Sequence, residues 1–207
     1  MARTERRIWA AAMLVPALLA AGPASAHHVM DGKLPTAWWE GLLAGFGHPR
    51  IGPDHFAVLV AAALLAVGRP RAPLLLAGFV LASLCGVFLH LGLFNLPAVE
   101  PVVALSVLLF GIGVAAARPV GNAVFAVLLI AAGVFHGYAF GESIVGAERT
   151  TLTGYLIGLA IIQYGLLLAV MLLAQRLGLP AARPLAYRIA GVVIAAVGVV
   201  FLALAVA

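Results

Sequence analysis

Histidine is the residue type of this sequence that carries the clearest chemical signal. The chain of 207 residues contains six histidines, seven acidic residues and one cysteine. Imidazole nitrogens bind borderline divalent ions such as nickel, cobalt and zinc, whereas calcium and magnesium prefer oxygen ligands. Soft copper(I) prefers sulfur ligands, which are few and scattered in this chain. The polar residues therefore predict a pathway or site for a divalent transition-metal ion.

The candidate metal ligands are all of the histidines and two of the carboxylates, namely His27, His28, His48, Asp54, His55, His90, His136 and Glu142. The group at 48–55 surrounds a segment rich in glycine and proline, which can fold His48 back toward Asp54 and His55. Asp54 and His55 are adjacent, so on a helix their side chains point in different directions. We expect at most one of them to contact a given ion, while the other orients a ligand or a water molecule.

The elements that position these side chains are expected to lie in a membrane. Hydrophobic residues make up 65% of the chain and charged residues 9%, whereas a soluble domain carries about 25% charged residues. A chain this apolar could not cover its surface in water, but lipid accepts it. The net charge is +5, yet the arginines are spread over short loops rather than gathered in a patch, so no nucleic-acid partner is expected. Cys85 lies in an apolar run and provides no disulfide framework.

Six apolar segments are long enough to cross a bilayer, which takes about 20 residues of helix. The predicted spans are 36–67, 73–93, 102–117, 122–140, 152–175 and 187–206. We expect the first span to be two short helices, 36–46 and 54–67, because the segment 47–53 between them contains two glycines and two prolines. The predicted fold is therefore an all-α, polytopic membrane bundle of six transmembrane helices with a broken first span.

The amino terminus has the pattern of a secretory signal peptide. Residues 1–26 begin with a group of arginines, continue with an apolar stretch at 8–21 and end in Ala-Ser-Ala. An uncleaved first helix is the alternative, but the apolar stretch is short for a span. Cleavage would leave 27–207 as a six-span membrane transport domain. His27 and His28 would then form a small exposed chelator at its amino terminus.

The distribution of charge predicts the orientation of the spans. Arginines are concentrated in the loops that follow the first, third and fifth spans, at Arg69, Arg71, Arg118, Arg176, Arg183 and Arg188. Arginine-rich loops face the cytoplasm, so a multi-pass protein of the bacterial inner membrane with a periplasmic mature amino terminus is expected. All six histidines then lie in the outer half of the membrane or beyond it. An ionisable residue at membrane depth costs about 2.5–3.5 kcal/mol, which makes each of them a functional candidate.

Two motifs of the sequence resemble a known family. The motif His48-Pro49-x-x-Gly52-x-Asp54-His55 resembles the first-span signature of the HupE/UreJ family of nickel/cobalt permeases. The segment 135–142, FHGYAFGE, resembles the second signature of that family, in its fourth span. The resemblance implies secondary transport of nickel or cobalt to supply metalloenzymes such as hydrogenase and urease. It implies a permease rather than an enzyme, with the ion as cargo, the bilayer as its surroundings and no resident cofactor.

The resemblance also implies that five residues matter for transport: His48, Asp54, His55, His136 and Glu142. One position departs from the family pattern, because Phe140 stands where the second signature usually has another histidine. Residues 136 and 140 are four apart and share a helix face, so one candidate ligand is missing from that face. His90 could supply a donor in its place.

Two other functions fit parts of the same pattern. An intramembrane zinc-dependent hydrolase would use similar ligands, with Asp54 or Glu142 as the base, but Ser143 is the only nearby hydroxyl of interest. A haem-binding membrane subunit would need two histidines facing each other across helices, and His55, His90 and His136 are the candidates. That function leaves both carboxylates without a role.

Overall fold

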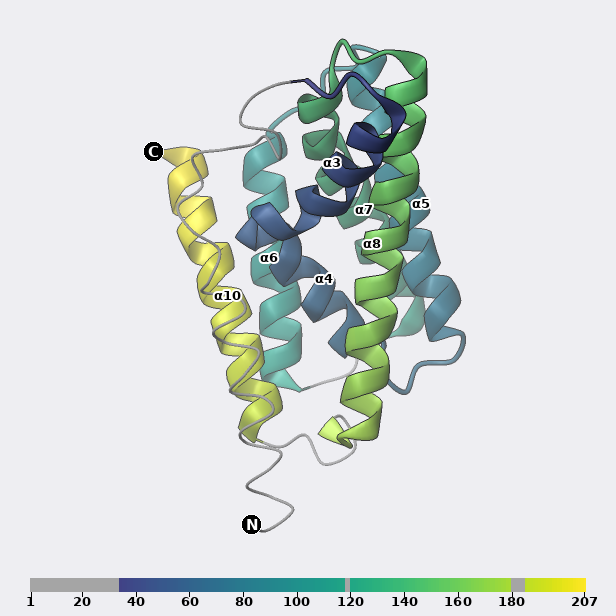
Figure 1. Cartoon of the computed structure of the whole chain (residues 1–207). Helices are drawn as coiled ribbons and strands as arrows, with labels where there is room; N and C mark the ends of the chain where they lie inside the picture. The colour runs from purple at the N-terminus through teal and green to yellow at the C-terminus, as the bar shows by residue number, and fades with distance from the viewer. Residues whose placement is uncertain (1–33, 118–119, 180–184) are drawn as a thin grey trace.

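The computed structural model describes residues 34–117, 120–179 and 185–207, and every regular element in these ranges is a helix (Figure 1). The helices are α3 Trp38–Ile51, α4 Pro53–Ala66, α5 Ala72–Leu91, α6 Val99–Ala116, α7 Asn122–Gly141, the 3-10 helix η1 Glu142–Ile144, α8 Arg149–Arg176 and α10 Leu185–Val206. The prediction of an all-α fold is confirmed for this part of the chain. The predicted signal peptide, His27 and His28 lie outside the described residues.

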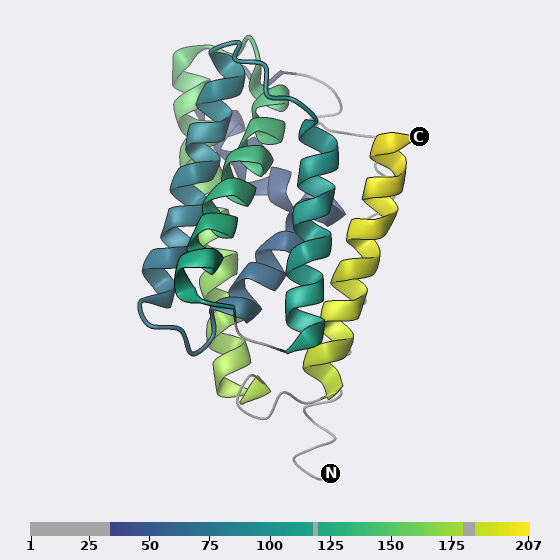
Figure 2. The same ribbon diagram turned by 180° about the vertical axis from the view of Figure 1, so that it is seen from behind.

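Five of these helices, α5, α6, α7, α8 and α10, are long and apolar enough to cross a membrane. The predicted ends of these five differ from the observed ends by at most three residues, at the starts of α6 and α8 (102 against 99, and 152 against 149). The five helices run side by side in alternating directions along the long axis of the molecule (Figures 1 and 2). The requirement for about 20 apolar residues per span explains why their sequence pattern predicts them so well.

The predicted break in the first span is present but shorter than expected. We expected segment 47–53 to be non-helical, but α3 continues through His48 and Pro49 to Ile51, and only Gly52 is extended (φ −84°, ψ 110°). The reason is the difference between the two prolines. Pro49 removes one backbone donor near the end of α3, whereas Pro53 forces the residue before it out of the helical region and then begins α4.

The two halves of the broken segment are each too short to cross a membrane. Each has 14 residues, or about 21 Å of helix at 1.5 Å per residue, against a hydrocarbon core of about 30 Å. In Figure 1, α3 lies obliquely across the bundle and α4 continues from its end toward the opposite end of the molecule. Only the two helices together extend from one end of the bundle to the other.

The long helices pack in pairs whose backbones touch at glycines. The pairs are α3 with α8, α5 with α7, and α6 with α10. A methyl group on Gly45 would overlap the carbonyl oxygen of Tyr155, and one on Gly137 would overlap that of Ser83. Gly191 is pressed in the same way against the backbone of Ala115. Such close approach is the usual means by which helices associate in lipid.

The half-helix α4 lies in the centre of the bundle. Between Ala57 and Ala66 every residue except Leu65 is buried, and α4 contacts α5, α6, α8 and α10. From both sides of the molecule it is seen among the longer helices (Figures 1 and 2). A helix that is apolar on all sides is typical of such a buried position.

The last turn of α4 is tied to its neighbours through its backbone carbonyl groups. The hydroxyl of Tyr187 donates to the carbonyl of Leu64 (3.3 Å), and Nε of Arg69 donates to that of Leu65 (2.7 Å). Carbonyl groups at the end of a helix lack partners within the helix, so these two side chains cap it.

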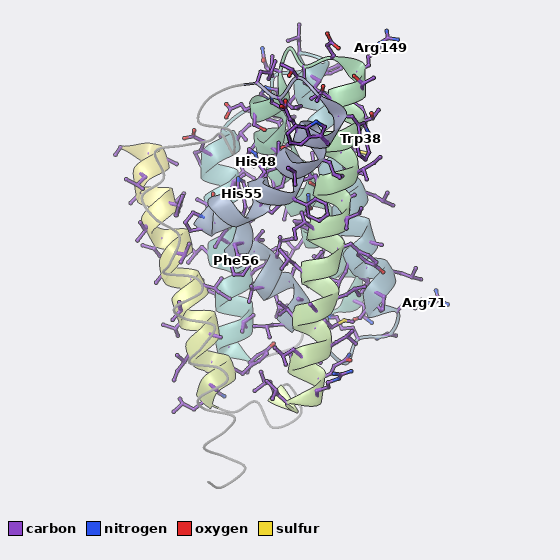
Figure 3. All side chains as sticks on the ribbon, viewed as in Figure 1. Trp38, His48, His55, Phe56, Arg71 and Arg149 are labelled. Atoms are coloured by element: carbon purple, nitrogen blue, oxygen red, sulfur yellow. The ribbon has the colours of Figure 1, made fainter. Side chains whose placement is uncertain are left out.

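Arg69 also reaches across to the start of α7. Its guanidinium group donates to the carbonyl of Val120 (3.0 Å) and to the side-chain oxygen of Asn122 (2.7 Å). The same group lies over the ring of Phe125, at 4.2 Å from the ring centre. We call this end of the bundle the arginine end. Figure 3 shows Arg71 near it and Arg149 at the opposite end.

Candidate metal site

The break between α3 and α4 brings histidines from both helices near each other. His48 lies in the last turn of α3 and His55 in the first turn of α4 (Figure 3). Gly52 lies between them, and a Cβ atom there would be 2.6 Å from Cδ2 of His55 and 3.0 Å from Oδ1 of Asp54. The absence of a side chain at Gly52 thus lets both residues fold back over the break.

Asp54 is buried at the start of α4, with 8% of its surface exposed. Its Oδ1 accepts a hydrogen bond from the backbone N–H of His55 (2.9 Å). A carboxylate is favoured at a helix amino terminus, where backbone N–H groups lack partners and the helix dipole is positive. Asp54 therefore brings a carboxylate to the break, at a position that suits it.

His55 contacts His136 of α7. The two Nδ1 atoms are 2.7 Å apart, which is a hydrogen bond and requires that one nitrogen donate and the other accept. On the other side of the His136 ring, Nε2 is 2.9 Å from Oγ of Ser106, and Ser106 donates to the carbonyl of Val103 (2.7 Å). Because the Ser106 hydroxyl hydrogen is used on that carbonyl, Ser106 accepts from Nε2 of His136.

This chain of hydrogen bonds has a direction that fixes the tautomers of the two histidines. With its proton on Nε2, neutral His136 accepts at Nδ1 from the Nδ1–H group of His55. Neutral His55 then carries its lone pair on Nε2. Metal ions bind imidazole through such a lone pair, and in this arrangement Nδ1 of His136 shares its lone pair with His55.

His48 and His55 both pack against Phe140. The ring centres of His48 and His55 are 6.5 Å apart, and Phe140 lies 5.2 Å from His48 and 4.4 Å from His55. The ring of Tyr155 closes the same region, 6.2 Å from His48. Phe140 therefore places an apolar ring among the histidines at the position where the motif usually carries another imidazole.

Two of the predicted site residues are not part of this cluster. His90 stacks against Tyr138 (4.5 Å between ring centres). Tyr138 is two residues from His136, so their side chains leave α7 about 200° apart. His90 thus contacts a different face of α7 and does not take the place of the missing donor in this conformation. Glu142 is exposed in η1, beyond the end of α7.

The described residues contain no group of three or more His, Cys, Asp or Glu side chains placed to hold one ion. Nδ1 of His55 and of His136 are instead joined by a hydrogen bond. Two ligand bonds of about 2.0–2.1 Å at an angle of about 90–109° would put two nitrogens about 2.9–3.3 Å apart. Opening this pair by less than about 1 Å would therefore admit an ion between the two rings.

The geometry also bears on the two other functions considered. Oγ of Ser143, the candidate nucleophile of a hydrolase, lies within hydrogen-bond distance of the carbonyl oxygen of Phe140 (3.0 Å) and the hydroxyl of Tyr155 (3.2 Å), and donates its one hydrogen to one of these oxygens rather than to a histidine. An iron between two axial imidazoles would hold their nitrogens about 4 Å apart, if its bonds resemble the roughly 2.0 Å of zinc to histidine. The 2.7 Å contact of His55 with His136 has no room for it.

Sequence reasoning missed Ser106 and Tyr155. Ser106 is the one hydroxyl residue of α6, and a polar residue in the middle of an apolar span is the signal that could have found it. Tyr155 is fully buried and donates to the carbonyl of Phe140 (2.8 Å). Its place beside His48 depends on the packing of α3 against α8, which no local pattern in the sequence reveals.

Comparison with known proteins gives one family and one curated relative. Residues 14–201 match the profile of the family described as HupE / UreJ protein. The relative, "Protein HupE" of Rhizobium leguminosarum bv. viciae, is 31% identical over 121 residues, which are 58% of this chain and 62% of that protein. The matched part is thus less than two thirds of the relative's length. No solved structure matches the chain.

Proposed function

The chain belongs to the HupE/UreJ family, and we propose on this premise that it transports nickel, or cobalt, across the bacterial inner membrane. It would act as a secondary transporter that supplies metalloenzymes such as hydrogenase or urease. The observation that supports the proposal most is the buried pair of His55 and His136 beside a helix break. Placing two imidazoles and a carboxylate in an apolar bundle costs free energy of insertion into the membrane, which makes these residues candidates for a function.

The ligand types suit a borderline divalent ion. Imidazole binds nickel, cobalt and zinc well, and Asp54 would offset part of the positive charge of an ion at the break. In the proposed cycle the ion separates His55 from His136 and takes the place of the proton between their Nδ1 atoms, and this proton is released to solvent. Metal and proton then compete for the same nitrogens, so capture weakens as the pH falls.

The broken helix supports transport rather than permanent binding. Non-helical backbone at membrane depth occurs where it is buried in protein or lines a cavity, and transporters place their ion sites at such breaks. A site with few protein ligands also leaves positions for water, so that the ion can be released. His48 would receive the ion first, because it lies in the half-helix that comes from the end of the bundle opposite the arginine end.

The orientation is part of the proposal. The arginine end would face the cytoplasm and the histidines would open to the periplasm. A reporter enzyme fused after Ala207 should be active in the periplasm, and one inserted at Pro70 should be active in the cytoplasm. The reverse result at either position would contradict a periplasmic metal site.

Uptake of radioactive nickel and cobalt, with each ion competing against the other, tests the proposed function. Cells expressing the chain should accumulate one of the ions at low external concentration. His55→Ala and Asp54→Asn should each reduce the initial rate by about 10–100-fold, the range for losing a ligand-orienting residue. His90→Ala is the matched control, because it removes a histidine on a different face of α7. Loss of the same size in all three variants would show that the cluster around His55 is not the site.

A further inference from the structure

A second buried polar pair lies beside the histidine cluster and has no role in the function proposed so far. Gln163 of α8 and Ser83 of α5 are both fully buried. Nε2 of Gln163 donates to Oγ of Ser83 (3.1 Å). The other half of the amide, Oε1 of Gln163, is buried and accepts no hydrogen bond from the described residues.

The burial of this oxygen calls for a reason other than stability. A buried acceptor without a partner costs its full desolvation free energy, and an apolar residue of similar size would not. Within a membrane no bulk water is at hand to repair the loss. Polar groups kept in such positions face substrate or ion pathways more often than they face lipid.

The pair lies next to the metal site, at about the level of His136 along the bundle. The carbonyl of Ser83 touches Gly137, the residue after His136. Phe79, one turn from Ser83 on α5, lies 6.3 Å from the His136 ring. Gln163 is two turns of α8, or about 12 Å, beyond Tyr155 in the direction of the arginine end.

We propose that Oε1 of Gln163 is a second ligand for the transported divalent cation, which reaches it after leaving His55 and His136. Ser83 is the positioning residue, because its Oγ holds Nε2 and so turns Oε1 toward the ion. An amide oxygen is a weaker ligand for nickel than an imidazole, which suits a station from which the ion moves on. This inference rests on the proposed function, since it concerns the same pathway.

The test compares Gln163→Leu with Gln163→Glu, which keeps an oxygen ligand. Gln175→Leu is the matched control, because Gln175 is the other glutamine of the chain and is exposed on the same helix. The measurements are initial nickel uptake against external nickel concentration, and the thermal stability of each purified protein in detergent. Gln163→Leu should lower the maximal rate by about tenfold with little change in KM, because capture at the histidines is unaltered.

A purely structural role for the pair gives a different result. Loss of a structural hydrogen bond would lower the melting temperature, whereas removal of an unsatisfied acceptor should leave it unchanged or raise it. Gln163→Glu should transport within about threefold of the wild type, and Ser83→Ala should have no further effect in a chain that already carries Gln163→Leu. Reduced uptake that follows reduced stability would overturn the inference.

The failure of this inference can be told apart from the failure of the proposed function. Equal maximal rates for the wild type and Gln163→Leu would remove the proposed ligand Gln163 alone. Equal rates for the wild type and His55→Ala would remove the metal site, and the role of Gln163 with it. Titration of the purified proteins with Co2+, followed by its visible absorption, should show the imidazole site in Gln163→Leu and its loss in His55→Ala.

Discussion

The two ends of α4 are chemically opposite. The helix begins at the break with Asp54 and His55, and it continues through Ala61, Ala62 and Ala63, which are fully buried among other apolar side chains. One half of the molecule's centre therefore carries polar side chains, while the other half consists of buried apolar side chains. An ion held at the break cannot pass along α4 unless the surrounding helices move apart.

The arginine end has a different chemistry. Arg69 joins the end of α4 to the loop before α7 and places a fixed positive charge there. Arg69 is only partly buried, so solvent screens the repulsion between this charge and a divalent cation. The contrast teaches that the two ends of α4 differ in chemistry, with polar side chains at the break and an apolar last turn capped by Arg69 at the other end.

The largest effect on uptake is expected for substitutions of the histidines beside the break. His136→Ala removes the partner of His55 and should reduce initial nickel uptake by about 10–100-fold. Met171→Leu changes a buried residue of similar volume, away from the break, and such exchanges are well tolerated. Uptake by Met171→Leu should stay within about twofold of the wild type. Similar losses in both variants would mean that the two regions do not differ in function.

A larger side chain in the apolar part of α4 should lower the stability of the protein. Ala62→Leu inserts three carbon atoms beside fully buried neighbours and should lower the free energy of unfolding by about 1–3 kcal/mol, measured by denaturation in mixed micelles. Ala131→Leu makes the same change on an exposed position of α7 and should alter stability by less than about 0.5 kcal/mol. A tolerant Ala62 would show that the centre of the bundle is loosely packed, and no large motion would then be needed for passage.

Adding a histidine near the break should strengthen metal binding there. Phe140→His would put an imidazole between His48 and His55, where the family motif usually has one. We expect nickel binding to the purified protein to become roughly tenfold tighter, the lower end of the range for ligand-orienting residues. Phe88→His, which adds a histidine at an exposed position of α5, should leave affinity unchanged. Unaltered binding in Phe140→His would place the ion away from Phe140.

The smallest effect is expected at the amino terminus, outside the described residues. A His27→Ala, His28→Ala double variant should transport normally at high external metal and about twofold less at low metal. Imidazoles bind metal only when deprotonated, and their usual pKa is about 6.5. The advantage of the wild type at low metal should therefore be present at pH 7.5 and lost as the pH falls to 6. Superimposed uptake curves at all pH values would leave these histidines without a role in capture.

The sequence predicts the long helices well because lipid imposes a length and a composition on each of them. It predicts the break less well, because two prolines with the same local signal have different effects: Pro49 is kept within α3 and Pro53 ends it. The spacing of four residues correctly placed Phe140 on the face of His136 that meets His55. The contact of Ser106 with His136 and the distance of His90 from His55 depend on which helices pack together, and hydropathy alone does not contain that information.

The glycine-lined helix pairs have a consequence for how the protein is made. Each pair joins helices that are not neighbours in the chain: α3 with α8, α5 with α7, and α6 with α10. During synthesis α3 must remain in the bilayer without its partner α8 while α4, α5, α6 and α7 are made. The partner of α6 is α10, which is the last helix to be made. Helices in lipid can insert first and associate later, so the chain would leave the insertion machinery largely unpaired. Ribosome stalling or truncation before α8 would then strand the glycine face of α3 in lipid, where quality-control proteases recognise unassembled helices.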